Sequence, residues 1–190
     1  MRTDPVRPAC RSAIRVLLVT AFILLLPLVA MHFTDEVVWG VADFAVAGAL
    51  LFGTGFTYAL IARKVDRVVY RFAIGVALAT ALLLVWLNLA VGVIGTEDDP
   101  ANLMYVGVLA VGIVGSVVAR LEPHRMALAL LATALAQSLV AVVAVAARLG
   151  SPSSGPGEIL ILNGLFVALF VGSAWLFERA ARTRSAPRSA

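Results

Sequence analysis

Charged residues and cysteine are scarce in this chain of 190 residues. Asp, Glu, Lys and Arg make up 14% of it, whereas soluble domains contain about a quarter. The one cysteine, Cys10, cannot form a disulfide within the chain, and the sequence has no CxxC motif or Cys/His set that would bind zinc. His32 and His124 form neither a pair within one apolar segment for haem nor an HExxH motif.

Sequence motifs of nucleotide-binding and hydrolytic enzymes are absent as well. The chain has no Walker loop, no GxSxG and no Gly-rich dinucleotide fingerprint. Consecutive acids occur at 35–36 and 97–99, but both groups lie in short polar segments and lack the spacing of a calcium-binding loop. We therefore predict that the protein is not an enzyme and has no cofactor and no metal site.

Long apolar runs fill most of the sequence instead. Hydrophobic residues account for 62% of the chain, and the mean hydropathy is +1.00. An apolar helix of about 20 residues crosses the hydrocarbon core of a bilayer. The runs predict an all-α integral membrane bundle of six transmembrane helices within 14–178, with basic tails at 1–13 and 179–190. The expected spans are about 14–33, 37–62, 68–95, 100–120, 125–147 and 159–178.

The basic residues alternate with these spans. Fourteen of the 15 Lys and Arg residues fall in or next to the two tails and the segments after the second and fourth spans; Arg148 is the exception. Because cytoplasmic segments are enriched in Lys and Arg, both termini are predicted to be cytoplasmic. The net charge of +4 then reflects topology and not a nucleic-acid partner. Contact of these arginines with anionic lipid head groups is a further interpretation.

The composition also indicates a source and a location. Almost all basic residues are Arg, and Ala, Val, Leu and Gly are abundant, which is typical of a GC-rich bacterial genome. We expect a multi-pass protein of the bacterial inner membrane with the lipid bilayer as its surroundings. The first span resembles a signal peptide in its basic start and apolar core. Its long apolar run and Leu28, three residues before a cut after Ala30, favour an uncleaved helix.

Polar residues in the outer half of the predicted spans are the candidates for a binding site. They are Asp43, Asn88, Asn102, Gln137 and Asn163. An ionisable group at membrane depth is costly, so Asp43 is the candidate charge carrier of an ion or small-solute pocket open to the outside. Alternatively, these groups hydrogen-bond one another and fix the helix packing. Asn102 also shares its helix face with Tyr105 and Ser116.

Small residues recur at four-residue spacing in three spans. The second span has Ala45, Ala49, Gly53 and Thr57, the third has Ala73, Ala77 and Ala81, and the sixth has Gly164, Ala168 and Gly172. Such stripes let helix backbones approach closely in lipid. They predict helix–helix contacts, either within one chain or between copies.

The loop "GTEDDPANLMY" at 95–105 separates the third and fourth spans. Asp99 is a good N-cap, and Pro100 suits the first helical position, where its missing N–H costs nothing. We therefore expect the three acids to start a helix and not to bind a cation.

The stretches "VWLNLAVGVIGTEDDPANLMYVGVLAVGIVG" and "ILILNGLFVALFVGSAWLF" resemble small multi-pass bacterial membrane proteins of no assigned activity. The resemblance covers the second to sixth helices and implies a membrane location, but no site. Two functions stay open: a structural or accessory protein that binds a partner or a copy of itself through its small-residue faces, and a small permease or ion pathway around Asp43.

Overall fold

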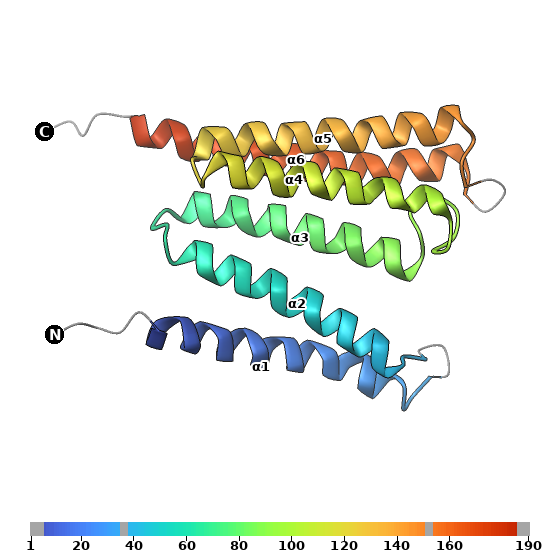
Figure 1. Cartoon of the computed structure of the whole chain (residues 1–190), viewed down its shortest axis with the longest axis horizontal. Coiled ribbons are helices and arrows are strands. Elements are labelled where there is room, and N and C mark those ends of the chain that lie inside the picture. Colours follow the sequence, from blue (N-terminus) through green and yellow to red (C-terminus); the bar gives the residue numbers. More distant parts are fainter. Residues whose placement is uncertain (1–5, 35–37, 151–153, 186–190) are drawn as a thin grey trace, which may run out of the picture. The chain divides into compact units, whose positions relative to one another are not determined.

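The computed structural model describes residues 6–34, 38–150 and 154–185, and these residues form helices joined by short connections (Figure 1). The helices are α1 (Val6–Ala30), α2 (Val41–Ala62), α3 (Val68–Ala90), α4 (Met104–Ala119), α5 (Pro123–Ala146) and α6 (Pro156–Ser185), with a short 3-10 helix η1 (Pro100–Leu103) before α4. Within the described residues, six helices are long and apolar enough to cross a membrane. The predicted all-helical fold is confirmed, while the side on which the termini lie stays a prediction.

The helices divide into two compact units, residues 1–66 and 67–190. In the first, α1 and α2 form a helical hairpin whose helices touch through glycine. A Cβ atom at Gly55 would lie 2.9 Å from Val16 Cγ1, and one at Gly48 would lie 3.4 Å from Leu24 Cδ1. The missing side chains therefore let α1 pack closely on α2.

In the second unit, α3 to α6 form a four-helix bundle. α5 packs on both α4 and α6, and α3 packs on α6, so the chain neighbours α3 and α4 have different main partners. At the α3–α6 contact the buried Ser173 hydroxyl donates to the Ala73 carbonyl over 2.8 Å. Nearby, the Tyr70 and Phe177 rings meet edge to face with centroids 5.0 Å apart. The stripe predicted in the third span thus begins at a helix contact.

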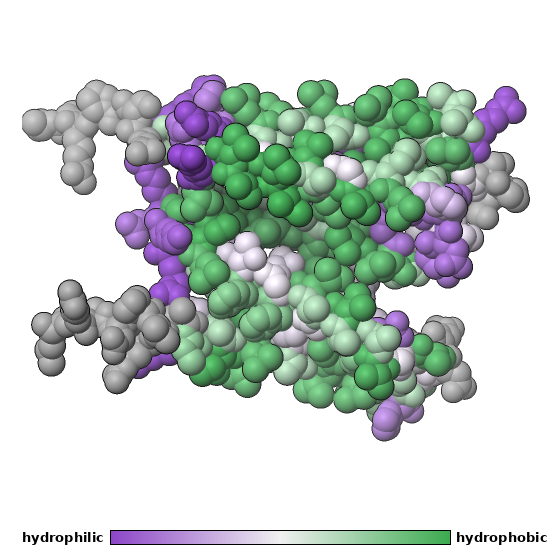
Figure 2. Space-filling model, in the orientation of Figure 1, coloured by the Kyte–Doolittle hydropathy of each residue, from purple (hydrophilic) through white to green (hydrophobic). Residues whose placement is uncertain are grey.

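Three helix ends differ from the ends of the predicted spans. α3 ends at Ala90, not near residue 95, because Gly92 and Gly95 adopt φ of +78° and +70°, which glycine reaches without steric cost. α1 begins at Val6 and α6 continues to Ser185, so both extend into the predicted tails. Along the bundle flank, hydrophobic residues lie between hydrophilic ends (Figure 2).

Candidate functional site

Three polar side chains meet in the interior of the α3–α6 bundle. Gln137 on α5 donates through Nε2 to Asn163 Oδ1 on α6 over 2.8 Å. The Tyr105 hydroxyl on α4 donates to the same oxygen over 3.0 Å. None of the three side chains is more than 1% exposed. We call this set the Tyr105–Gln137–Asn163 cluster; it joins three helices through one amide oxygen.

The geometry of the cluster leaves one acceptor unused. Asn163 satisfies its own amide by donating to the Ile159 carbonyl one turn earlier, over 2.8 Å. Gln137 Oε1 is buried and accepts no hydrogen bond from the described residues. A buried carbonyl oxygen without a donor is unfavourable in an apolar interior. The cluster therefore fixes the helices firmly but retains a free acceptor.

Asn102, predicted to belong to the same set, has another role. Its Oδ1 accepts hydrogen bonds from the Val93 and Ile94 amides at 3.1 and 3.0 Å. Its Nδ2 donates to the carbonyls of Ile94 and Thr96 at 3.1 and 2.7 Å. One side chain thus satisfies four backbone groups in the turn after α3.

The same end of the bundle brings two loops together. The Gly95 amide donates to Ser154 Oγ over 3.1 Å. A Cβ atom at Gly150 would lie 2.6 Å from the Gly95 nitrogen, so a side chain would not fit there. Asp99 caps η1 by accepting from the Ala101 amide over 2.9 Å. The predicted helix start is therefore confirmed.

The remaining two candidates make other hydrogen bonds. Asn88 on α3 donates to its own helix at the Leu84 carbonyl over 3.2 Å, and its Oδ1 is buried without a donor among the described residues. Asp43 belongs to the hairpin unit, where it is exposed in the first turn of α2. It accepts from the Gly40 amide over 2.7 Å. Its local role is to cap α2.

Tyr105 is not among the residues that the sequence pattern predicts for the site. The pattern places it on the same helix face as Asn102. The two diverge because Asn102 lies in η1, before α4 begins, and turns to the preceding loop. The sequence feature that could have predicted the role of Tyr105 is a tyrosine within an apolar helix, because a buried tyrosine hydroxyl usually finds a hydrogen-bond partner.

The two remaining small-residue stripes lie on helix faces that are open in the described structure. Cβ atoms built at Gly53, Gly164 and Gly172 would meet no atom within 4 Å. Ala45, Ala49 and Ala168 are exposed. The predicted role of these two stripes in helix packing stays a prediction.

The chemistry of the cluster is that of hydrogen bonding. It contains two amides and a phenol and no carboxylate, and among the described residues no group of three His, Cys, Asp or Glu could hold a metal ion. With six helices able to span a bilayer, the chain has the form of a polytopic membrane protein. Comparison with family models, with curated proteins and with solved structures gives no match.

Proposed function

We infer that the protein is a structural or accessory protein of the bacterial inner membrane, without enzymatic activity, which binds a second transmembrane helix through α6. The single observation behind this proposal is the open stripe of Gly164, Ala168 and Gly172. Side chains at the two glycines would meet no atom within 4 Å, and Ala168 is exposed. The resemblance to small multi-pass bacterial membrane proteins is part of the same proposal.

Glycine has a cost in a helix that faces only lipid. Relative to Ala it destabilises a helix interior by about 1 kcal/mol. Elsewhere in the chain this cost is offset by close packing: a Cβ atom at Gly115 would lie 2.9 Å from Ala129 Cβ. The α6 stripe has open space in front of its glycines, and small residues are the usual contact surface between helices in lipid. These two points support the proposal that a helix from another chain packs on the stripe.

A second copy of the same chain is the partner that we propose. The stripe has small residues at regular four-residue spacing on one face, so two α6 helices can meet through identical surfaces across a two-fold axis. Right-handed crossings of this kind bring the backbones close together. The α2 stripe of Ala45, Ala49 and Gly53 offers a similar face for a further contact.

Disulfide crosslinking tests this interface. In a Cys10→Ser background, Ala168→Cys should crosslink to dimers in native membranes on mild oxidation, because the two α6 helices would be in contact. Gly107→Cys is the matched control: Gly107 on α4 is also exposed and open, but Leu103 and Val111 lie one turn away in place of small residues. Equal crosslinking at both positions would reject a specific α6 interface.

The second variant tests the glycines themselves. Gly164→Leu with Gly172→Leu should weaken self-association by about ten-fold or more in a fluorescence energy-transfer titration in proteoliposomes, which corresponds to ~1.4 kcal/mol. Gly107→Leu should leave it unchanged. Unaltered association of the double variant would remove α6 from the proposal.

A permease or ion pathway is the alternative function. It is favoured by the unused acceptor at Gln137 Oε1, which is buried inside a helical bundle. It is disfavoured by the position of Asp43, because the proposed charge carrier is exposed and caps the start of its own helix. We therefore place the structural function first.

A further inference from the structure

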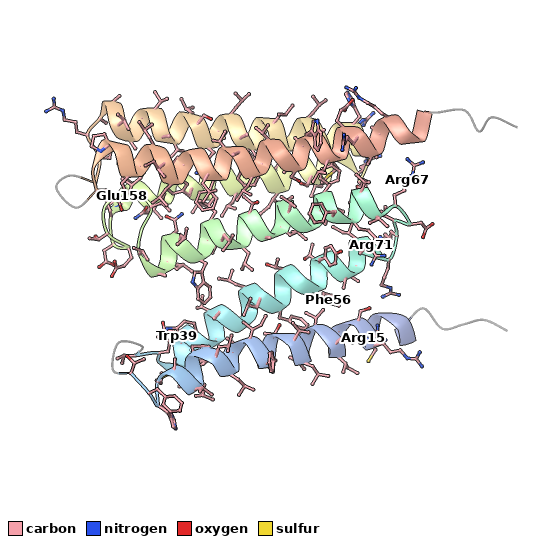
Figure 3. All side chains as sticks on the ribbon, turned by 180° about the vertical axis from the view of Figure 1, so that it is seen from behind. Arg15, Trp39, Phe56, Arg67, Arg71 and Glu158 are labelled. Carbon is pink, nitrogen blue, oxygen red and sulfur yellow. The ribbon has the colours of Figure 1, made fainter. Side chains whose placement is uncertain are left out.

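One end of the α3–α6 bundle has a surplus of positive charge. Seven arginines and two glutamates occur there, at the start of α3, the turn between α4 and α5, and the last turns of α6. The residues are Arg67, Arg71, Arg120, Arg125, Arg179, Arg182 and Arg184, with Glu122 and Glu178. Arg67 and Arg71 lie at the opposite end of the bundle from Glu158 (Figure 3).

Hydrogen bonds hold these segments together. The Tyr70 hydroxyl donates to the Leu121 carbonyl over 2.6 Å and so joins the start of α3 to the α4–α5 turn. Arg67 Nη1 donates to the Ala180 carbonyl over 3.0 Å and joins the start of α3 to the end of α6. The arginine-rich end is consequently a connected surface and not a set of independent chain ends.

Both glutamates at this end are already occupied. Glu122 pairs with Arg125 over 2.7 Å. Glu178 contacts His124 at 2.9 Å and Arg182 at 3.6 Å. These two glutamates therefore do not neutralise the remaining arginines, and the other described acid next to these segments in sequence is Asp66, one residue before Arg67.

Arg71 and Arg120 are the two arginines at this end whose described side chains contact neither an acid, nor a carbonyl, nor an aromatic ring. Both are exposed, and neither side chain pairs with an acid in the described parts of the chain. They adjoin Tyr70 and Leu121 in sequence, the two residues that the hydrogen bond joins. The Tyr70 side chain therefore links the two chain segments that carry these arginines, and each arginine lies one residue from that contact.

The backbone at Arg120 adds a second feature. Arg120 and Leu121 have φ of 49° and 63°, a left-handed conformation that glycine adopts with less strain. A bulky cationic residue at such a position is unusual at the end of a helix, where glycine is most common. This conformation turns the chain sharply between α4 and α5 and so determines the position of the Arg120 Cβ atom.

Apolar surface borders the two arginines. Phe72, one residue after Arg71, is 63% exposed, and Val117, three residues before Arg120, is 70% exposed. On α6 the Arg179 guanidinium lies 4.0 Å from the centre of the Trp175 ring. Tryptophan side chains prefer the head-group level of a bilayer. Positive charge and exposed apolar side chains therefore occur together at this end. A ligand with an anionic head group and acyl chains needs both.

We propose that Arg71 and Arg120 form a binding site for the phosphate of an anionic phospholipid, whose acyl chains lie against the apolar flanks of α3 and α4. A guanidinium group binds phosphate oxygens through two parallel hydrogen bonds. A free phosphate offers the same oxygens but makes no use of the apolar border. The site is independent of the α6 stripe and does not require self-association.

Native mass spectrometry of the full-length protein in a neutral detergent tests the site. Dioleoyl phosphatidylglycerol and dioleoyl phosphatidylcholine, which share their acyl chains, are titrated separately. The first phosphatidylglycerol should bind more tightly than the first phosphatidylcholine, by about five-fold for each arginine involved. Arg71→Gln with Arg120→Gln should remove most of this preference.

Two further variants separate the site from general charge and from misfolding. Arg148→Gln removes an exposed arginine from the opposite end and should leave the preference unchanged. Arg71→Lys with Arg120→Lys retains the charge and should keep at least half of the preference on a logarithmic scale. An unchanged preference in the Gln pair, an equal loss in Arg148→Gln, or complete displacement of the lipid by millimolar inorganic phosphate would overturn the proposal.

Discussion

The α1–α2 hairpin and the α3–α6 bundle are both built from apolar helices long enough to cross a bilayer, yet they differ in what they bury. Among the described side chains of the hairpin, Thr20, Ala47 and Ala62 are buried. The bundle buries large residues, including Leu84, Phe166 and Phe177. Hydropathy thus identifies a membrane helix, but the size and polarity of its buried face determine what it packs on.

Polar contacts account for much of this difference. In the bundle, one oxygen of Asn163 joins α4, α5 and α6, and Ser173 joins α6 to α3. Hydrogen bonds between helices contribute about 0.6–1.7 kcal/mol each in lipid, where hydrophobic burial gains little. In the hairpin, the side chains of Leu24 and Val16 on α1 instead lie against Gly48 and Gly55 on α2.

The largest expected effect comes from the same substitution in each unit. Leu84→Ala should lower the free energy of unfolding by about 3 kcal/mol, because Leu84 is 0% exposed and its removal leaves a cavity. Leu26→Ala should cost less than about 0.5 kcal/mol, because Leu26 is 65% exposed. Unfolding by SDS titration in mixed micelles measures both. Equal costs would contradict the distinction between the units.

A smaller effect is expected within the bundle. Asn163→Ala removes the acceptor shared by Tyr105 and Gln137 and leaves two buried donors unpaired, so it should cost about 1–3 kcal/mol. Asn88→Ala is the matched control and should cost no more than about 0.6 kcal/mol, since its hydrogen bond lies within one helix. The same SDS titration applies. A greater cost at Asn88 would show that the cluster does not hold the bundle together.

The smallest effect concerns the hairpin. Asp43→Asn keeps an acceptor for the Gly40 amide but removes the negative charge at the start of α2, at a cost of about 0.5 kcal/mol. Hydrogen exchange should quicken in the first turn of α2 and stay unchanged in α5. Solute or ion flux in proteoliposomes should not change. A loss of flux would support the permease alternative against the structural function.

The sequence predicts local features of this fold well. The six helices follow from long apolar runs, and the cap at Asp99 follows from the order of Asp and Pro, since both depend on residues close together in the chain. The pairing of α3 with α6 was not predicted. In a chain rich in Ala and Gly, small residues occur on several faces of each helix, and the choice between them depends on the shapes of distant partners.

The candidate site shows the same division. Gln137 and Asn163 can be predicted as site residues because polar amides stand out in apolar helices, and these two are hydrogen-bonded to each other. The role of Asn102 could not be predicted, because it depends on the turn that Gly92 and Gly95 create before it. The sequence predicts Asp43 inside a span because that span is expected to start near residue 37, whereas α2 begins at Val41 and Asp43 lies in its first turn.

The pairing of α3 with α6 has a consequence for biosynthesis. Helices leave the ribosome in chain order, so α1 and α2 of the hairpin are both synthesised before the helices of the bundle. α3 enters the membrane before its main partner has been translated, and the loop after it awaits Ser154, 59 residues beyond Gly95. Until α6 is inserted, the face of α3 that is buried in the final structure must contact lipid or the insertion machinery instead. This face includes Thr80 and the Ala73 carbonyl, which later accepts the hydrogen bond from Ser173.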